Sequence, residues 1–108
     1  MVEPAVVSGV QNYLRQLSKH GLVISFGVIF GSYALGKASQ WSDIDLIVVS
    51  PNFDHGIDRE SVKILWRVAA RTDSRIEPIP CGRHQWQEDD SSPIIEIARN
   101  EGATVNLT

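Results

Sequence analysis

The sequence predicts a single layered α/β (α+β) domain, in which helices flank a small sheet. Segments with helical periodicity alternate with short apolar segments rich in Val and Ile, which are typical of buried strands. The 108 residues, of which 43% are apolar and 21% charged, suffice for one core and have a globular composition. We therefore interpret residues 1–108 as one domain, whose strand order the pattern leaves open.

The first helix is predicted from an apolar stripe with helical spacing. The stripe consists of Val6, Val10, Tyr13, Leu14 and Leu17. Pro4 suits the first helical position, and Gly21 suits the C-terminal stop. The apolar run 22–30 then predicts a strand buried on both faces, and residues 33–36 leave room for about one helical turn.

A second buried strand is predicted at residues 43–50, where it ends before Pro51. Asp58 suits the N-cap of a helix that continues to about Arg71. The inner face of this helix is predicted to consist of Val62, Leu65, Trp66 and Ala69.

A third strand is predicted at residues 75–79. Pro78 and Pro80 lack N–H groups on the same side, so this strand is expected to lie at a sheet edge or to be only partly paired. The remaining predicted elements are a polar connection at 81–91, a helix at 93–100 capped by Ser92, and a short strand around 105–107.

Charge and cysteine content exclude several classes of protein. Ten basic and thirteen acidic residues give a net charge of −3, which argues against long nucleic acid as a partner. Cys81 is the only cysteine, so no internal disulfide can form and a cytoplasmic location is expected. The first residues lack the basic region of a secretory signal, and the longest apolar run is too short to span a membrane.

Two carboxylates are predicted to lie on one face of the second strand. Asp43 and Asp45 are two residues apart, so their side chains project to the side that farther along carries Ile47 and Val49. Carboxylates beside a core raise each other's pKa unless a cation neutralises them. Because Mg²⁺ commonly binds one or two carboxylates together with substrate phosphates, the pair predicts a magnesium site.

Gly31 and Ser32, which follow the first predicted strand, indicate a phosphate site. Glycine lets the backbone approach a ligand closely, and a turn that opens a helix presents free N–H groups to an anion. The Ser32 hydroxyl adds a further donor. A phosphate site beside metal-binding carboxylates indicates phosphoryl or nucleotidyl transfer.

Together these motifs resemble a known signature. Gly31-Ser32, a ten-residue gap that ends in Ser42, and residues 43–46 (Asp-Ile-Asp-Leu) resemble the signature of the DNA polymerase β-like nucleotidyltransferase superfamily. The chain is most similar to its minimal nucleotidyltransferases (MNT), which are often encoded beside HEPN-domain toxins. The resemblance implies the nucleotidyltransferase fold, with a small mixed sheet flanked by helices. It also implies a Mg²⁺-dependent enzyme that transfers AMP from ATP to a hydroxyl.

The resemblance further implies a role for each site residue. Asp43 and Asp45 would bind two Mg²⁺ ions, with Glu77 as a third carboxylate that is a metal ligand or the general base. Gly31 and Ser32 would bind the β- and γ-phosphates of ATP. The acceptor would be a tyrosine of a cognate HEPN toxin, so that the chain is the antitoxin of a toxin–antitoxin pair. Because the chain is small, we expect another chain, a toxin or a second copy, to complete the cleft.

The sequence departs from the family pattern at Leu35 and at Pro78, which stiffens the strand that carries Glu77. Many relatives have Arg where this chain has Leu35, and Lys37 is the nearest cation. A second hypothesis is therefore an antitoxin that neutralises its partner by binding alone, without catalysis. A third is nucleotide transfer to a small molecule such as an aminoglycoside, which usually needs an added domain.

A basic ridge is predicted along the helix that follows Asp58. Its members recur every four residues and are Arg59, Lys63, Arg67, Arg71 and Arg75. The ridge could dock an acidic partner or phosphate, but a solvated helix face is the simpler interpretation. We interpret Trp86 as a packing residue and Cys81 as inert, whereas Trp41 either walls the site or covers the end of the sheet.

Overall fold

The computed structural model describes residues 2–39 and 41–108. The helices and strands follow in the order α1 (Pro4–Lys19), β1 (Phe26–Phe30), β2 (Ile44–Ser50), α2 (Arg59–Thr72), β3 (Ile76–Gly82), α3 (Arg83–Glu88), α4 (Pro93–Glu101) and β4 (Ala103–Val105). Short 3₁₀ turns follow two of the strands, η1 (Gly31–Tyr33) after β1 and η2 (Pro51–Phe53) after β2.

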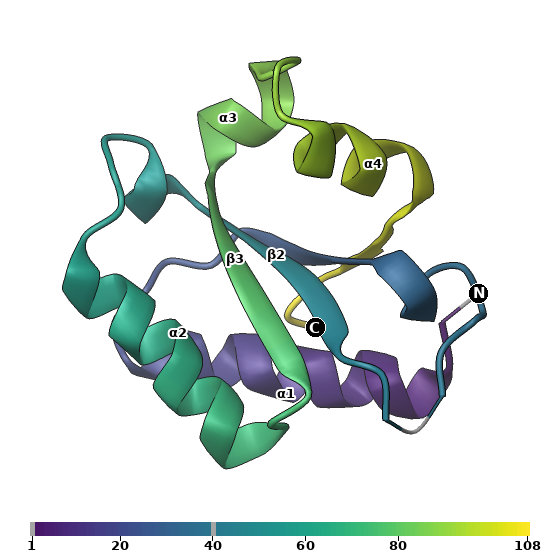
Figure 1. The fold of residues 1–108 in the computed structure, drawn as a ribbon. Coiled ribbons are helices and arrows are strands. Elements are labelled where there is room, and N and C mark those ends of the chain that lie inside the picture. The colour runs from purple at the N-terminus through teal and green to yellow at the C-terminus, as the bar shows by residue number, and fades with distance from the viewer. Residues whose placement is uncertain (1, 40) are drawn as a thin grey trace.

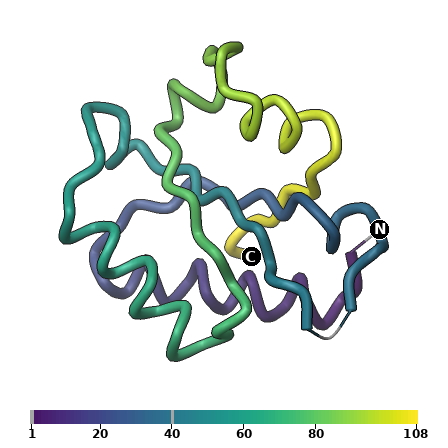
Figure 2. Tube along the Cα trace, viewed as in Figure 1, coloured from purple at the N-terminus to yellow at the C-terminus, as the bar shows by residue number. Residues whose placement is uncertain are grey.

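In the described part of the chain, four strands form one sheet in the order β3-β2-β1-β4. β2 and β3 are parallel, and the other neighbouring strands are antiparallel. α1 and α2 cover one face of the sheet, and α3 and α4 lie on the other (Figure 1). The chain trace shows the same layers around the central strands (Figure 2). The predicted α/β domain with a small mixed sheet flanked by helices is confirmed.

The apolar stripe of α1 is buried as predicted. Within it, Tyr13 has no exposed surface, and its hydroxyl donates a hydrogen bond of 2.9 Å to the Leu65 carbonyl oxygen of α2. Burial raises the pKa of the Tyr13 hydroxyl well above its ordinary value, so this group stays neutral and remains a donor. The bond joins α1 to α2 within the layer that covers one face of the sheet.

β2 is buried on both faces, as its apolar run predicts. Ile44, Leu46 and Val48 pack in the core formed with α1 and α2. Ile47 and Val49 pack on the opposite face, in a second cluster that includes buried residues of α4. The alternation predicted for this strand is therefore confirmed, and it places the side chain of Asp45 on the α4 side.

The first strand is shorter than predicted. The prediction of a strand from residue 22 is wrong, because the pairing of β1 with β2 ends at Phe26 and Val49. Val23 is 61% exposed, and its N–H group donates to the Asn52 side-chain oxygen at 2.8 Å instead of to a strand. The helical turn predicted at residues 33–36 is also misplaced, because η1 directly follows β1.

β3 lies at the edge of the sheet, as its two prolines predict. The strand is longer than predicted, because its parallel pairing continues to the last residue of β2. The polar connection predicted at residues 81–91 is therefore wrong. Cys81 is buried within β3, and the short helix α3 follows this strand directly.

α2 begins as predicted but presents a different inner face. The Asp58 carboxylate caps the helix by accepting a hydrogen bond of 2.6 Å from the Ser61 N–H group. The prediction that Trp66 faces inward is wrong, because this side chain is 49% exposed and Val68 is buried instead. α2 packs against α1 and β3, and its buried residues are Leu65, Val68 and Ala69.

The C-terminal elements follow the prediction closely. Ser92 caps α4 by accepting a hydrogen bond of 3.4 Å from the Ile95 N–H group, and β4 then pairs with β1. Leu107, predicted to belong to the last strand, lies beyond its end. Among the residues that the structure describes, no helix is both long and apolar enough to cross a membrane.

Candidate functional site

The three predicted carboxylates lie at one end of two neighbouring strands. Asp43 directly precedes β2, Asp45 is the second residue of β2, and Glu77 is the second residue of β3. The strand register pairs Asp45 with Glu77 on one side and with Phe30 of β1 on the other. Because Phe30 is followed at once by Gly31, the structure brings the carboxylates and the predicted phosphate site to the same end of the sheet.

The carboxylates perturb one another electrostatically. The charge of Asp43 is the main cause that raises the pKa of Glu77, with smaller contributions from burial, a hydrogen bond with Asp43 and the charge of Asp45. Burial is the main cause that raises the pKa of Asp45, and the charge of Asp43 adds to it. Within the described ranges, no Lys, Arg or His forms an ion pair with these three residues. The site is therefore a concentration of negative charge that lacks a balancing cation.

Gly31 brings the backbone of η1 against Asp45. Its φ angle is +74°, in the left-handed region, and a Cβ atom at this position would overlap Asp45 Oδ2. Both the backbone conformation and the close approach therefore require glycine here. Ser32 is half-buried beside it. The first N–H groups of such a turn have no acceptor within the turn, so they are available to an anion.

The chemistry of these donors fits a Mg²⁺ ion. Among the described residues, no group of three His, Cys, Asp or Glu side chains is arranged to hold a metal ion. Mg²⁺ does not require one, because it usually takes one or two carboxylates and completes its coordination with water and substrate phosphates. Asp43 with Asp45 or with Glu77 provides such a pair. A cation there would offset the repulsion by Asp43, which is the main cause that raises the pKa of Glu77 and adds to the effect of burial at Asp45.

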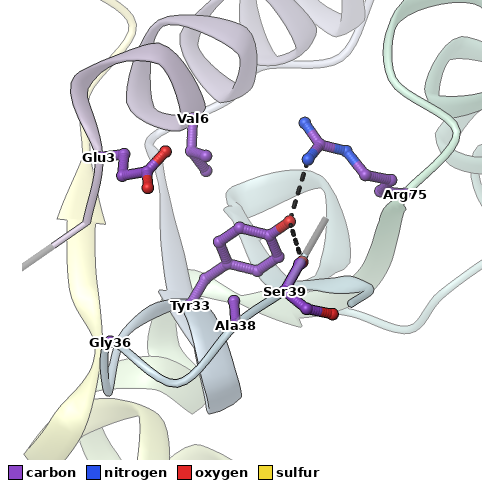
Figure 3. A pocket seen from close by; sticks show the side chains of 7 residues that line it. All are labelled: Glu3, Val6, Tyr33, Gly36, Ala38, Ser39 and Arg75. Carbon is purple, nitrogen blue, oxygen red and sulfur yellow. Dashed lines mark hydrogen bonds between the residues drawn. The ribbon is translucent and has the colours of Figure 1, made fainter. Parts of the chain in front are cut away.

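A cavity of about 470 Å³ lies next to the turn after β1, and none of the five predicted site residues lines it. Its walls are formed by Glu3, Val6, Tyr33, Gly36, Ala38, Ser39 and Arg75 (Figure 3). The three predicted carboxylates provide the negative charge that a metal–nucleotide complex needs, whereas none of these three lines the cavity. We therefore place the candidate site at the carboxylates.

Sequence reasoning missed two residues that connect the segments of the site. The spacing predicts Arg75 as the last member of the basic ridge, which is wrong because α2 ends at Thr72. The Arg75 guanidinium instead pairs with Asp73 at 2.7 Å and donates to the Tyr33 hydroxyl at 3.0 Å. This pairing holds the pKa of Asp73 below its ordinary value. The Asp-Ser pair at residues 73–74, which favours a helix end, is the signal that could have separated Arg75 from the ridge.

The remaining members of the basic ridge lie apart from the carboxylates. Their side chains are exposed on α2, which covers the opposite face of the sheet from the one that carries Asp45. They are Arg59, Lys63, Arg67 and Arg71. Near the candidate site, Leu35 is 48% exposed and Lys37 is also exposed. Trp41 is 84% exposed, so the idea that it covers the end of the sheet is wrong.

Trp86 and Cys81 are packing residues, as predicted. The Trp86 ring meets Phe26 edge to face at 5.9 Å, and the Arg99 guanidinium lies 5.7 Å from its centre. Cys81 is buried, and burial raises the pKa of its thiol to about 11. A thiol with such a pKa is protonated at neutral pH, which makes it a poor nucleophile.

Comparisons with known proteins identify the family and the fold. Residues 7–96 match the family model described as a nucleotidyltransferase domain. A chain from a toxin–antitoxin crystal structure with AMP-PNP is 18% identical, with a TM-score of 0.59, and the match covers 87% of this chain and 70% of that one. No match was found among curated proteins.

Two further solved structures share the fold. A candidate nucleotidyltransferase from Sulfolobus solfataricus is 16% identical, with a TM-score of 0.57 and coverage of 91% of this chain and 77% of that chain. A chain from the complex of a tri-AMPylated Shewanella oneidensis HEPN toxin with an MNT antitoxin is 16% identical, with a TM-score of 0.55 and coverage of 91% and 70%. At these identities, the structural likeness shows a common fold.

Proposed function

This chain belongs to the nucleotidyltransferase domain family, and on that premise we propose that it transfers AMP from ATP to a hydroxyl group with the aid of Mg²⁺. The observation that carries the proposal is the position of Asp45. Its carboxylate lies against Gly31 of the turn and is paired in register with Glu77. A turn with the chemistry to bind phosphate and carboxylates with the chemistry to bind a metal therefore lie side by side, and nucleotidyl transfer needs this combination.

In this proposal, each residue acts at a stated position. Gly31 and Ser32 would bind the β- and γ-phosphates, and Asp43 and Asp45 would hold Mg²⁺. Bound Mg²⁺ supplies neutralisation of the negative charge on the attacking and leaving oxygens. The acceptor oxygen bonds to the α-phosphorus as the bond to the bridging oxygen breaks, and pyrophosphate leaves. Glu77 accepts the hydroxyl proton or completes the coordination of the metal.

We propose that the acceptor is a tyrosine of a HEPN-domain toxin, so that this chain is an antitoxin. The support comes from the residues that resemble MNT proteins and from the shared fold with a complex that contains a tri-AMPylated HEPN toxin and an MNT antitoxin. A single minimal nucleotidyltransferase domain over residues 1–108 and a cytoplasmic location stay predictions.

The proposal is tested with Asp43→Asn, which removes one charge and keeps the shape of the side chain. We expect transfer of label from α-³²P-ATP to the protein that co-purifies with the chain to fall by roughly a hundredfold or more. Asp90→Asn is the matched control, because Asp90 is also an exposed aspartate and lies outside the cluster. This control should transfer label at the wild-type rate.

Two results would change the conclusion. Wild-type transfer by Asp43→Asn would remove the carboxylate cluster from the reaction. Loss of transfer with full neutralisation of the partner would instead favour the antitoxin that acts by binding alone. Neutralisation is measured as growth of cells that express the partner together with each variant.

A further inference from the structure

The segment of residues 31–42 carries the phosphate-site turn and leads into Asp43. Among its described residues, Tyr33 and Ala38 pack with the core and Gly31 lies against Asp45. The segment's backbone hydrogen bonds are internal, for example from the Lys37 N–H group to the Ser32 carbonyl oxygen at 2.9 Å. Among the described residues of this segment, the hydrogen bond that connects a side chain to another element joins Tyr33 to Arg75. The cavity lies beside this bond, because Tyr33, Ser39 and Arg75 all line it (Figure 3).

Tyr33 is anchored in the core and reaches across the segment. It is only 9% exposed, and its ring belongs to the core cluster on the α1 face. Its hydroxyl donates a hydrogen bond of 3.2 Å to the Ser39 carbonyl oxygen and accepts one of 3.0 Å from Arg75 Nη1 (Figure 3). One hydroxyl therefore links the two arms of the segment to Arg75, the residue that directly precedes β3.

Arg75 is itself held rigidly. Its Nε and Nη2 atoms donate to the two carboxylate oxygens of Asp73 at 3.0 and 2.7 Å, a fork that fixes the plane of the guanidinium. Its carbonyl oxygen accepts a hydrogen bond of 2.7 Å from the N–H group of Ile44, the first residue of β2. Arg75 thus contacts the strand that carries Asp45, stands two residues before Glu77, and bonds to the turn that contains Gly31.

We propose that Tyr33 and Arg75 are positioning residues that hold segment 31–42 so that the phosphate-site turn and the carboxylates keep their mutual geometry. The inference rests on the proposed function, because it concerns the arrangement that nucleotide binding needs. Neither side chain touches the reacting groups in this proposal. Both residues act through the segment. When either side chain is lost, the free energy of local opening should fall in the segment and not in the sheet.

The first test measures hydrogen exchange in Tyr33→Phe, which keeps the buried ring and removes the hydroxyl. We expect the Lys37 and Ser42 amides, which bond inside the segment, to exchange about tenfold faster than in the wild type. Amides of the β1–β4 pair should keep their wild-type rates. Tyr13→Phe is the matched control, because it also removes a bonded hydroxyl from a buried ring, but at a site between α1 and α2.

The second test measures binding of AMP-PNP with Mg²⁺ by calorimetry. Tyr33→Phe and Arg75→Lys should bind about fivefold to tenfold more weakly than the wild type, whereas Tyr13→Phe and Arg71→Lys should bind equally well. A merely structural role would lower the melting temperature in Tyr33→Phe, as in Tyr13→Phe, and would leave affinity unchanged.

The outcomes separate this inference from the proposed function. Wild-type exchange of the segment in Tyr33→Phe would overturn the inference, and so would faster exchange with unchanged affinity. If the wild type itself binds no nucleotide, the proposed function fails. In that case, the hydrogen-exchange measurement by itself tests whether Tyr33 and Arg75 hold the segment in place.

Discussion

Gly31 offers a sharp test of how close the phosphate-site turn and the carboxylates must be. In Gly31→Ala, the new methyl group meets two obstacles. The backbone is in the left-handed region at φ +74°, and the Cβ position overlaps Asp45 Oδ2. The first obstacle affects stability, and the second forces the Asp45 carboxylate away from its place in the site.

The two effects can be separated because other glycines meet only the first obstacle. Gly36 has φ +70° and Gly21 has φ +95°, and a Cβ at either position meets nothing within 4 Å. A non-glycine residue in this region costs about 1–2 kcal/mol, partly offset by the lower entropy of the unfolded chain. In a domain of this size, that corresponds to a loss of roughly 4–12 °C in melting temperature. Gly31→Ala should lower the melting temperature further, because moving the Asp45 side chain out of its preferred rotamer adds a cost of about 1 kcal/mol.

The assay combines thermal unfolding with calorimetric binding of AMP-PNP and Mg²⁺. All three Gly→Ala variants should melt below the wild type, and Gly31→Ala should also lose nucleotide binding by at least about tenfold. Gly21→Ala, which lies outside segment 31–42, should bind as the wild type does. Equal affinity in Gly31→Ala and Gly21→Ala would refute the reasoning, because it would show that the contact between the turn and Asp45 is not needed.

Two further predictions concern charge and the core. Without divalent cations, Asp45 and Glu77 should contribute a rise in melting temperature as the pH falls below 7, because their raised pKa values make their ionisation costly only in the folded chain, whereas the lowered pKa of Asp73 acts in the opposite direction at more acidic pH. Saturating Mg²⁺ should remove this rise and Asp45→Asn should reduce it; an equal rise in all three conditions would contradict the reasoning. Tyr13→Phe should lower stability by about 1 kcal/mol, measured by urea unfolding, since it loses the bond to Leu65, and an unchanged midpoint would argue against that bond.

The elements that follow from local chemistry could be predicted from the sequence. The caps at Asp58 and Ser92 act within three residues, and the stripe of α1 depends only on helical spacing. The two-faced burial of β2 and the edge position of β3 are likewise consequences of alternation and of proline chemistry. In each case, the physical cause lies inside the element itself.

The predictions failed at positions whose structure is determined by packing or pairing with a neighbouring element. Trp66 is apolar and close to the inner face of α2, but its side chain stays exposed when α2 packs against α1 and β3. Val23 is apolar enough for a strand, yet the pairing of β1 with β2 ends before it. Arg75 has the spacing of the basic ridge, but the helix ends three residues earlier and frees its side chain to reach Tyr33.

The sequence by itself determined which residues have the chemistry of the candidate site, because a glycine-serine turn and two aspartates two residues apart are local patterns, although Asp43 lies just before β2 and not within it as predicted. Only the tertiary structure decided that they meet. The strand order β3-β2-β1-β4 places Glu77 beside Asp45 and the turn after β1 on its other side. Which strands become neighbours depends on how helices pack on both faces of the sheet, and no short stretch of sequence contains that information.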